Sequence, residues 1–110
     1  MGGALEIATS DILLVAATQP ELCGHAGLVC GVGPVEAAVA TARALAATRP
    51  RIVLHVGIAG AHRASGLEPP QLVLGSLAIY EDLHLTTGLA TREANPDEEL
   101  LRVAREVLPA

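Results

Sequence analysis

The chain has 110 residues, 51% of them hydrophobic, and a formal net charge of −5. This length predicts one small domain, and the hydrophobic content is sufficient for a packed core. Acidic residues are spread along the chain, which argues against a nucleic-acid partner. All seven basic residues are arginine, which excludes a Walker-type phosphate lysine, a Schiff-base amine and a lysine general base.

The chain carries no pattern typical of membrane insertion or secretion. Its longest apolar run, residues 12–17, is far shorter than the roughly 20 residues of a membrane-spanning helix. The N-terminus lacks the basic region of a secretory signal. We therefore expect a cytoplasmic protein without a membrane partner, in which Cys23 and Cys30 are small buried hydrophobic residues rather than metal ligands.

The first half of the chain alternates apolar runs with turn residues. We expect a disordered N-terminal segment at residues 1–10 and one domain from 11 to 110. Residues 12–18 and 28–30 are predicted strands, because they are continuous aliphatic runs. Pro34 suits the first position of a helix that Pro50 ends. Helical spacing predicts that its buried face consists of Val35, Ala38, Val39, Ala42 and Leu45.

The second half is less regular. A third strand is predicted at residues 51–56 and a fourth within 72–80, whereas residues 61–71 and 81–94 read as loops. Asn95 is the expected N-cap of a second helix, in which Pro96 takes the first position. The predicted buried face of this helix consists of Leu100, Val103, Ala104 and Val107. Apolar strands that do not alternate, combined with helices, predict the α/β class with a partly parallel sheet.

Gly31-Val32-Gly33 lies between a predicted strand and a predicted helix. Such a turn exposes backbone N–H groups at the positive end of the helix dipole, where an anion or a hydroxyl oxygen can bind. The alternative is a tight turn without a ligand. A dinucleotide-binding fingerprint is disfavoured, because Glu36 stands where the third glycine is required and would repel a pyrophosphate.

Gly57-Ile58-Ala59-Gly60 is a second turn of small residues after a predicted central strand. Open α/β sheets bind their ligands at this carboxyl edge. The alternative is a bend that glycine permits. Glu21, three residues after the first predicted strand, falls at the same edge, although most loop glutamates are simply solvated.

Four segments in this order resemble the purine nucleoside phosphorylase and nucleosidase superfamily. They are ILLVAATQPEL at 12–22, CGVGPVEAAVATAR at 30–43, IVLHVGIAGA at 52–61 and IYEDL at 79–83. The run of Gly-Val-Gly-Pro-Val and Val-Gly-Ile-Ala-Gly-Ala is most similar to futalosine hydrolase, followed by methylthioadenosine/adenosylhomocysteine nucleosidase. The resemblance implies a partial three-layer α/β/α domain of the nucleoside phosphorylase type, with a mostly parallel sheet and a truncated C-terminal half.

The resemblance also implies a reaction and a set of site residues. The family hydrolyses or phosphorolyses an N-glycosidic bond without a cofactor, through an oxocarbenium-like state. Glu21 matches the glutamate that activates the attacking water. The positions that line the ribose and base correspond to Thr18, Val32, Gly33, Ile58, Ala59 and Gly60. No metal is implied, and His25, His55, His62 and His84 are scattered without metal-ligand spacing.

The family's catalytic Asp and its ribose-binding Met-Glu pair have no counterpart in this sequence. We therefore expect weak or no activity for the chain alone. The sequence differs from the family again at Pro70-Gln71, where a Gly-Asp pair is usual, and at His84. Two functions follow from these observations: a futalosine-hydrolase-like enzyme acting on a small-molecule nucleoside, or a non-catalytic ligand-binding or assembly module. We expect a homo-oligomer, because an uncovered sheet edge promotes association.

Overall fold

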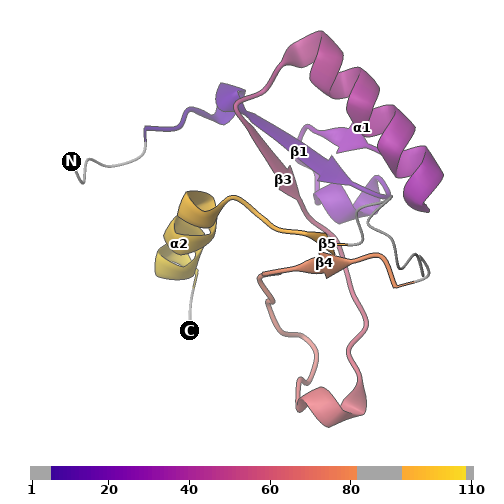
Figure 1. The fold of residues 1–110 in the computed structure, drawn as a ribbon, viewed down its shortest axis with the longest axis vertical. Helices are drawn as coiled ribbons and strands as arrows, with labels where there is room; N and C mark the ends of the chain where they lie inside the picture. Colours follow the sequence, from indigo (N-terminus) through magenta and orange to yellow (C-terminus); the bar gives the residue numbers. More distant parts are fainter. Residues whose placement is uncertain (1–5, 82–92, 109–110) are drawn as a thin grey trace, which may run out of the picture. The chain divides into compact units, whose positions relative to one another are not determined.

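The computed structural model describes residues 6–81 and 93–108, and it divides into two compact units, residues 1–61 and 62–110 (Figure 1). The first unit contains, in chain order, η1 (Thr9–Asp11), β1 (Ile12–Ala16), η2 (Pro20–Leu22), β2 (Leu28–Val29), α1 (Pro34–Thr48) and β3 (Ile52–His55). The second contains η3 (Arg63–Ser65), β4 (Ala78–Ile79), β5 (Glu93–Ala94) and α2 (Glu98–Val107). The elements labelled η are short 3-10 helices.

The first unit is built on a three-stranded parallel sheet in the order β2-β1-β3. Leu14 pairs with Leu54 and Ala16 pairs with Val29, so β1 is bonded on both edges. This central position explains why Val15 and Ala16 are buried, with 4% and 0% of their surfaces exposed. The predicted α/β class with a mostly parallel sheet is confirmed.

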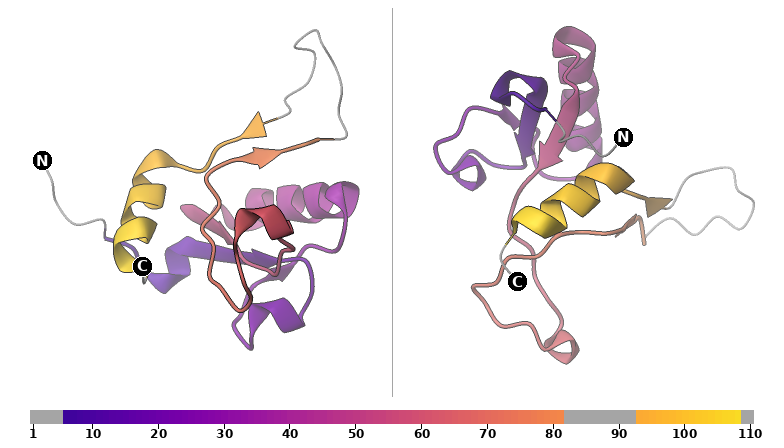
Figure 2. Two further views of the ribbon diagram at one scale, coloured as in Figure 1. Left: turned by 90° about the horizontal axis from the view of Figure 1, so that it is seen from below. Right: turned by 90° about the vertical axis from the view of Figure 1, so that its left-hand side faces the viewer.

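Helix α1 begins at Pro34 and ends at Thr48, as the two prolines predicted, and Figure 2 shows it beside the sheet in both views. The prediction of its buried face was wrong. The half-buried residues are Ala37, Ala40, Thr41 and Ala44, whereas the predicted residues Val35, Ala38, Val39, Ala42 and Leu45 are exposed. Both stripes follow helical spacing, and the stripe of small residues allows a closer approach of the helix to the sheet.

The second unit contains a short antiparallel pair, in which Ala78 pairs with Ala94 and Ile79 pairs with Glu93. The fourth strand thus lies within the predicted range. The prediction of a loop over 81–94 is wrong at Glu93–Ala94, and residues 82–92 of it lie outside the described residues. These strands are exposed, so burial patterning could not identify β5.

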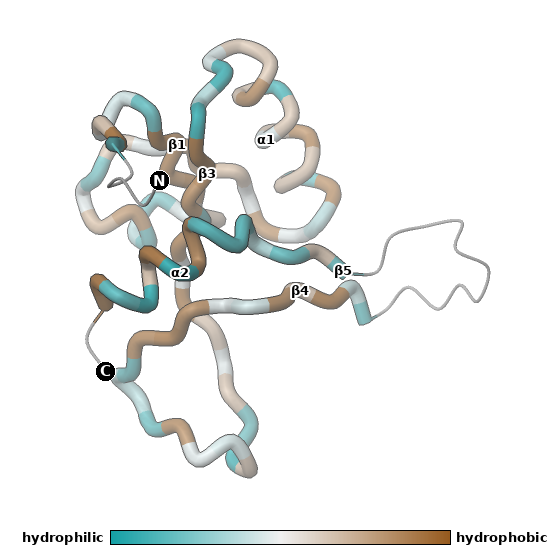
Figure 3. The backbone as a smooth tube through the Cα atoms, turned by 60° about the vertical axis from the view of Figure 1, so that its left-hand side comes forward, coloured by the Kyte–Doolittle hydropathy of each residue, from teal (hydrophilic) through white to brown (hydrophobic). Residues whose placement is uncertain are grey.

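Helix α2 is capped by Asp97 rather than by Asn95. The Asp97 carboxylate accepts a hydrogen bond of 3.0 Å from the backbone N–H of Leu100, and the helix begins at Glu98. Leu100, Val103 and Ala104 are half-buried as predicted, whereas Val107 is 73% exposed. Hydrophilic and hydrophobic stretches alternate along α2 in Figure 3, as expected of an amphipathic helix.

All buried residues of the described part lie in the first unit: Val15, Ala16, Leu22 and Cys30. The prediction for Cys30 is therefore confirmed, whereas Cys23 is exposed and follows the η2 turn with a φ of 51°. Of the N-terminal segment, residues 9–11 form η1 and residues 1–5 lie outside the described part, so the domain boundaries stay predictions. No helix in the described ranges is long and apolar enough to cross a membrane.

Candidate functional site

Three connections of the first unit follow the carboxyl ends of neighbouring parallel strands. Residues 17–21 follow β1, residues 30–33 follow β2, and residues 56–60 follow β3. Because β1 lies between the other two strands, its connection is the middle one at this edge of the sheet. The topology therefore brings the predicted site segments to the edge where α/β sheets bind ligands.

The carboxylate of Glu21 connects two of these segments. The Thr18 hydroxyl donates a hydrogen bond of 2.6 Å to its Oε1 atom. The backbone N–H of Ile58, 37 residues further along the chain, donates one of 3.0 Å to its Oε2 atom. Glu21 is half-buried and lies in η2, where Pro20 takes the first position. The connections after β1 and β3 are thus joined directly through one side chain.

These hydrogen bonds favour the ionised form of Glu21. The Thr18 hydroxyl, and next the Ile58 N–H, hold the pKa of the Glu21 carboxyl below its ordinary value. Partial burial opposes this effect, and the Thr18 backbone amide and the charge of His55 add to it. A glutamate with a lowered pKa is ionised at neutral pH. The site therefore contains a fixed carboxylate that can accept hydrogen bonds.

The turn between β2 and α1 consists of glycines and an exposed valine that lie close to a second carboxylate, that of Glu36. Gly33 has a φ of 98°, which strongly favours glycine, and Val32 is 74% exposed. Glu36 lies in the first turn of α1, and its Oε2 atom is 3.8 Å from the place that a Cβ on Gly31 would take. A carboxylate here complements the helix dipole and repels anions. The turn is thus better suited to a neutral hydroxyl group than to a phosphate.

The predicted site residues are only partly in contact. Thr18, Glu21 and Ile58 form one hydrogen-bonded group. The remaining four lie on the connections at the same edge, without a hydrogen bond to Glu21 within the described residues: Val32, Gly33, Ala59 and Gly60. The Ile58 side chain is 90% exposed, so only its backbone is engaged.

Glu21 also lines a hollow of about 440 Å³ in the first unit. Leu14 and Leu54 are partners across β1 and β3, so their side chains lie on the same face of the sheet. The other lining residues are Leu22, Cys23, His25 and Val56. Sequence reasoning placed neither Cys23 nor His25 at the site, although both follow Glu21 closely in the chain.

A family model described as the phosphorylase superfamily matches residues 22–110. The chain belongs to the phosphorylase superfamily. The match includes both glycine turns but begins one residue after Glu21, so it contains neither Glu21 nor Thr18. Comparisons with curated proteins and with solved structures gave no match.

Membership of the phosphorylase superfamily agrees with the fold. The parallel sheet and helices are consistent with part of a nucleoside phosphorylase-type domain. The family also points to chemistry at the glycosidic bond of a nucleoside. This chemistry suits a site at the carboxyl edge of the sheet, because an oxocarbenium-like state is stabilised by a nearby carboxylate.

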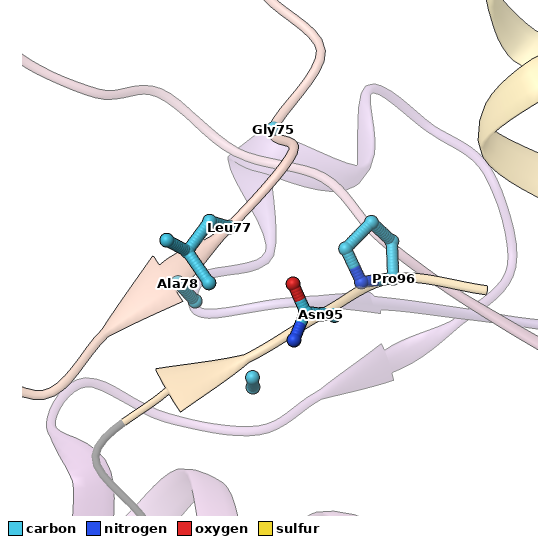
Figure 4. A pocket seen from close by; sticks show the side chains of 6 residues that line it. Gly75, Leu77, Ala78, Asn95 and Pro96 are labelled. Atoms are coloured by element: carbon cyan, nitrogen blue, oxygen red, sulfur yellow. The ribbon is translucent and has the colours of Figure 1, made fainter. Parts of the chain in front are cut away.

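A second hollow of this superfamily member, of about 260 Å³, lies within the second unit. Gly75, Leu77 and Ala78 line it from one side of the antiparallel pair, and Ala94, Asn95 and Pro96 line it from the other. Figure 4 shows the Asn95 amide beside the side chains of Leu77 and Pro96. Because no titratable side chain lines this hollow, it offers no acid, base or nucleophile.

Two histidines of this phosphorylase-superfamily chain lie near Glu21, because His25 lines its hollow and His55 contributes to its lowered pKa. His55, the last residue of β3, is exposed. The carbonyl of His62 accepts a hydrogen bond of 2.7 Å from the Ser65 hydroxyl. His84 lies outside the described residues. Residues 6–81 and 93–108 contain no group of three or more His, Cys, Asp or Glu that could hold a metal ion.

Proposed function

We propose that the chain carries a futalosine-hydrolase-like site that hydrolyses the N-glycosidic bond of a purine nucleoside derivative, in menaquinone biosynthesis. The observation that carries this proposal is the Glu21 carboxylate, held between the Thr18 hydroxyl and the Ile58 N–H at the carboxyl edge of the sheet. The match to the phosphorylase superfamily supports the class of reaction.

Glu21 has the properties needed to direct a water molecule. An ionised carboxylate has about four acceptor sites, and the Thr18 hydroxyl, the Ile58 N–H and the Thr18 backbone amide use up to three of them. The remaining site can hold the attacking water and accept its proton as the new C–O bond forms at the ribose C1′ atom. A lowered pKa makes Glu21 a weak base, which suits a dissociative reaction, because an oxocarbenium-like carbon needs an oriented water more than a strong nucleophile.

The charges around the site favour water over phosphate as the second substrate. Glu21 places a carboxylate on the connection that follows β1, and Glu36 places one in the first turn of α1, just after the connection that follows β2. The chain has no lysine, and no arginine lines the hollow that contains Glu21. A phosphate would therefore meet negative charge without a compensating cation. This supports hydrolysis rather than phosphorolysis.

The departing purine needs a proton, and the family's acid has no counterpart in this sequence. We therefore propose that the chain alone is slow. The nucleoside would bind with its ribose and base against Val32, Gly33, Ala59 and Gly60, which lie on the connections beside Glu21.

The test is release of the purine base from futalosine and from methylthioadenosine, with and without added phosphate. We expect slow release that phosphate does not accelerate and that Glu21→Gln lowers by about 10²-fold or more, the usual effect of removing a general base. Glu68→Gln, an exposed glutamate of the second unit, is the matched control and should keep the parent rate. Equal, negligible rates in the parent and Glu21→Gln would overturn the enzyme proposal.

A non-catalytic assembly module is the second candidate. β3 is an edge strand, and its Val53 and Leu54 side chains are 44% and 48% exposed. Within the described residues no strand pairs with the outer edge of β3, and such edges promote association between copies. Light scattering after size exclusion tests this candidate, and a clean monomer would remove it.

A further inference from the structure

We propose that Gly57 is a positioning residue for Glu21: the space left by its missing side chain is where the Glu21 carboxylate is held. This inference rests on the function proposed above, because it assigns a role within the same site. It concerns the group formed by Thr18, Glu21, Gly57 and Ile58, called the Glu21 clamp below.

The Glu21 carboxylate occupies the space next to Gly57 that a side chain there would need. A Cβ atom on Gly57 would lie 2.7 Å from Oε2 of Glu21 and 3.7 Å from its Cδ atom. Separations under 3.0 Å essentially never occur for real Cβ atoms, so Glu21 and an alanine could not both keep these positions. By contrast, a Cβ on Gly60, in the same turn, would meet no atom within 4 Å. Of these two glycines, only Gly57 lies this close to the Glu21 carboxylate.

The backbone does not require glycine at position 57. The glycines with a positive φ in the described residues are Gly24, Gly31, Gly33 and Gly66, so alanine can adopt the conformation of Gly57 without strain. The need for glycine therefore comes from the Glu21 carboxylate and not from the turn.

In Gly57→Ala we expect the Glu21 carboxylate to move and the backbone of the turn to stay in place. The N–H of Val56 donates a hydrogen bond of 2.9 Å to the carbonyl of Val15, which ties the start of this turn to the central strand. Glu21 meets Gly57 only with the end of a flexible side chain. In Gly57→Ala the carboxylate would move away, lose the Ile58 N–H, and strain or lose its hydrogen bond from Thr18. The fold should change little, whereas the orientation of the carboxylate should change substantially.

The experiment compares the parent, Gly57→Ala and Gly75→Ala. Gly75 is the control, because a Cβ there would also meet no atom within 4 Å and its φ is not positive. Carboxyl-detected NMR measures the titration of Glu21, the amide spectrum reports on Ile58, and thermal unfolding reports on the fold. In Gly57→Ala we expect the pKa of Glu21 to rise toward its ordinary value and the Ile58 amide to shift, with only the small loss of stability near pH 7 that this rise in pKa implies. Gly75→Ala should match the parent in all three.

Base release supplies a second readout. Gly57→Ala should lower kcat by nearly the same factor as Glu21→Gln, and the double variant should lose nothing further, because both changes remove the same group. An unchanged Glu21 titration and Ile58 amide in Gly57→Ala would overturn the inference. A double variant whose fold-loss in kcat equals the product of the two single losses would also overturn the inference.

The two proposals fail separately. If Gly57→Ala shifts the titration of Glu21 but neither the parent nor Glu21→Gln releases a base, the positioning role stands and the hydrolase proposal fails. If the parent releases base, Glu21→Gln does not, and Gly57→Ala behaves as the parent does, the function stands and the positioning role fails.

Discussion

The two units of the chain differ in what holds their backbone in place. In the first unit a parallel sheet is bonded on both edges of β1, and Val15, Ala16, Leu22 and Cys30 are buried. In the second unit none of the described residues is buried, and β4 and β5 share only two residue pairs. A side chain can be positioned accurately only where its support is packed. We therefore expect the first unit, which contains Glu21, to hold its side chains in more definite positions than the second unit does.

The largest expected effect is a lower free energy of unfolding when core packing is lost at Leu22, the residue next to Glu21. Leu22 has 2% of its surface exposed and lines the hollow beside Glu21. Leu22→Ala should lower the free energy of unfolding by about 2–5 kcal/mol. The matched change in the second unit is Leu72→Ala, where the side chain is 67% exposed and the effect should stay within about 0.5 kcal/mol. Denaturant unfolding measures both, and similar losses would contradict the comparison.

A smaller effect is expected from overpacking next to the central strand. A Cβ on Gly27 would lie 2.6 Å from the carbonyl oxygen of Leu14 and 2.9 Å from Cδ2 of Leu22. Because a backbone atom cannot move aside cheaply, Gly27→Ala should cost about 1–3 kcal/mol of stability. Gly60→Ala, with open space around it, should leave stability unchanged or raise it by up to about 1 kcal/mol. If Gly27→Ala unfolds at the parent's denaturant midpoint, the close packing of this connection is wrong.

In the second unit, the N-terminus of α2 is capped by the Asp97 side chain. Asp97→Ala removes the hydrogen bond to the Leu100 N–H and should cost about 0.5–2 kcal/mol of helix stability. Amide hydrogen exchange should show the loss within residues 98–107, with protection of β1 unchanged. Asp97→Asn can still accept this hydrogen bond and is the control. Loss of protection in β1 as well would show that the two units unfold together.

The smallest expected effect is a change in how the stability of the fold depends on pH. A carboxyl whose pKa is lowered in the folded state stabilises the fold above its unfolded pKa, and this contribution is lost as the pH falls through the folded pKa. Thr18→Val removes the largest cause of the lowered pKa of Glu21. The variant should therefore be less stable than the parent near pH 7, and the difference should shrink as the pH falls below the ordinary pKa of a glutamate. Thr18→Ser keeps the hydroxyl and should follow the parent. A difference that does not vary with pH would contradict the assigned interaction.

Much of the first unit could be predicted from local patterns. Pro34 and Pro50 predicted the bounds of α1, and continuous aliphatic runs predicted the three parallel strands. The rule that parallel strands present their ligands at one edge predicted Glu21 at the same edge as the glycine turns. The predictions of the helix bounds and of the strands succeed because each depends on residues close together in the chain.

Other features depend on tertiary contacts or on choices between equivalent patterns. Ala37 and Ala40 fit helical spacing as well as Val35 and Val39 do, so periodicity could not tell which stripe of α1 meets the sheet. Asn95 and Asp97 are both good caps, and only the structure shows which is used. The bond from the Ile58 N–H to Glu21 spans 37 residues and involves a backbone atom, so no side-chain pattern signals it.

The most direct test of the nucleoside site is an NMR titration of the labelled chain with methylthioadenosine. We expect amide shifts at residues 18–21, 31–33 and 57–60, with little change in residues 62–108, and weaker binding by Glu21→Gln. Shifts confined to residues outside these three connections, or a spectrum that stays unchanged at saturating ligand, would contradict the claim that Glu21 and the two glycine turns form one nucleoside-binding site.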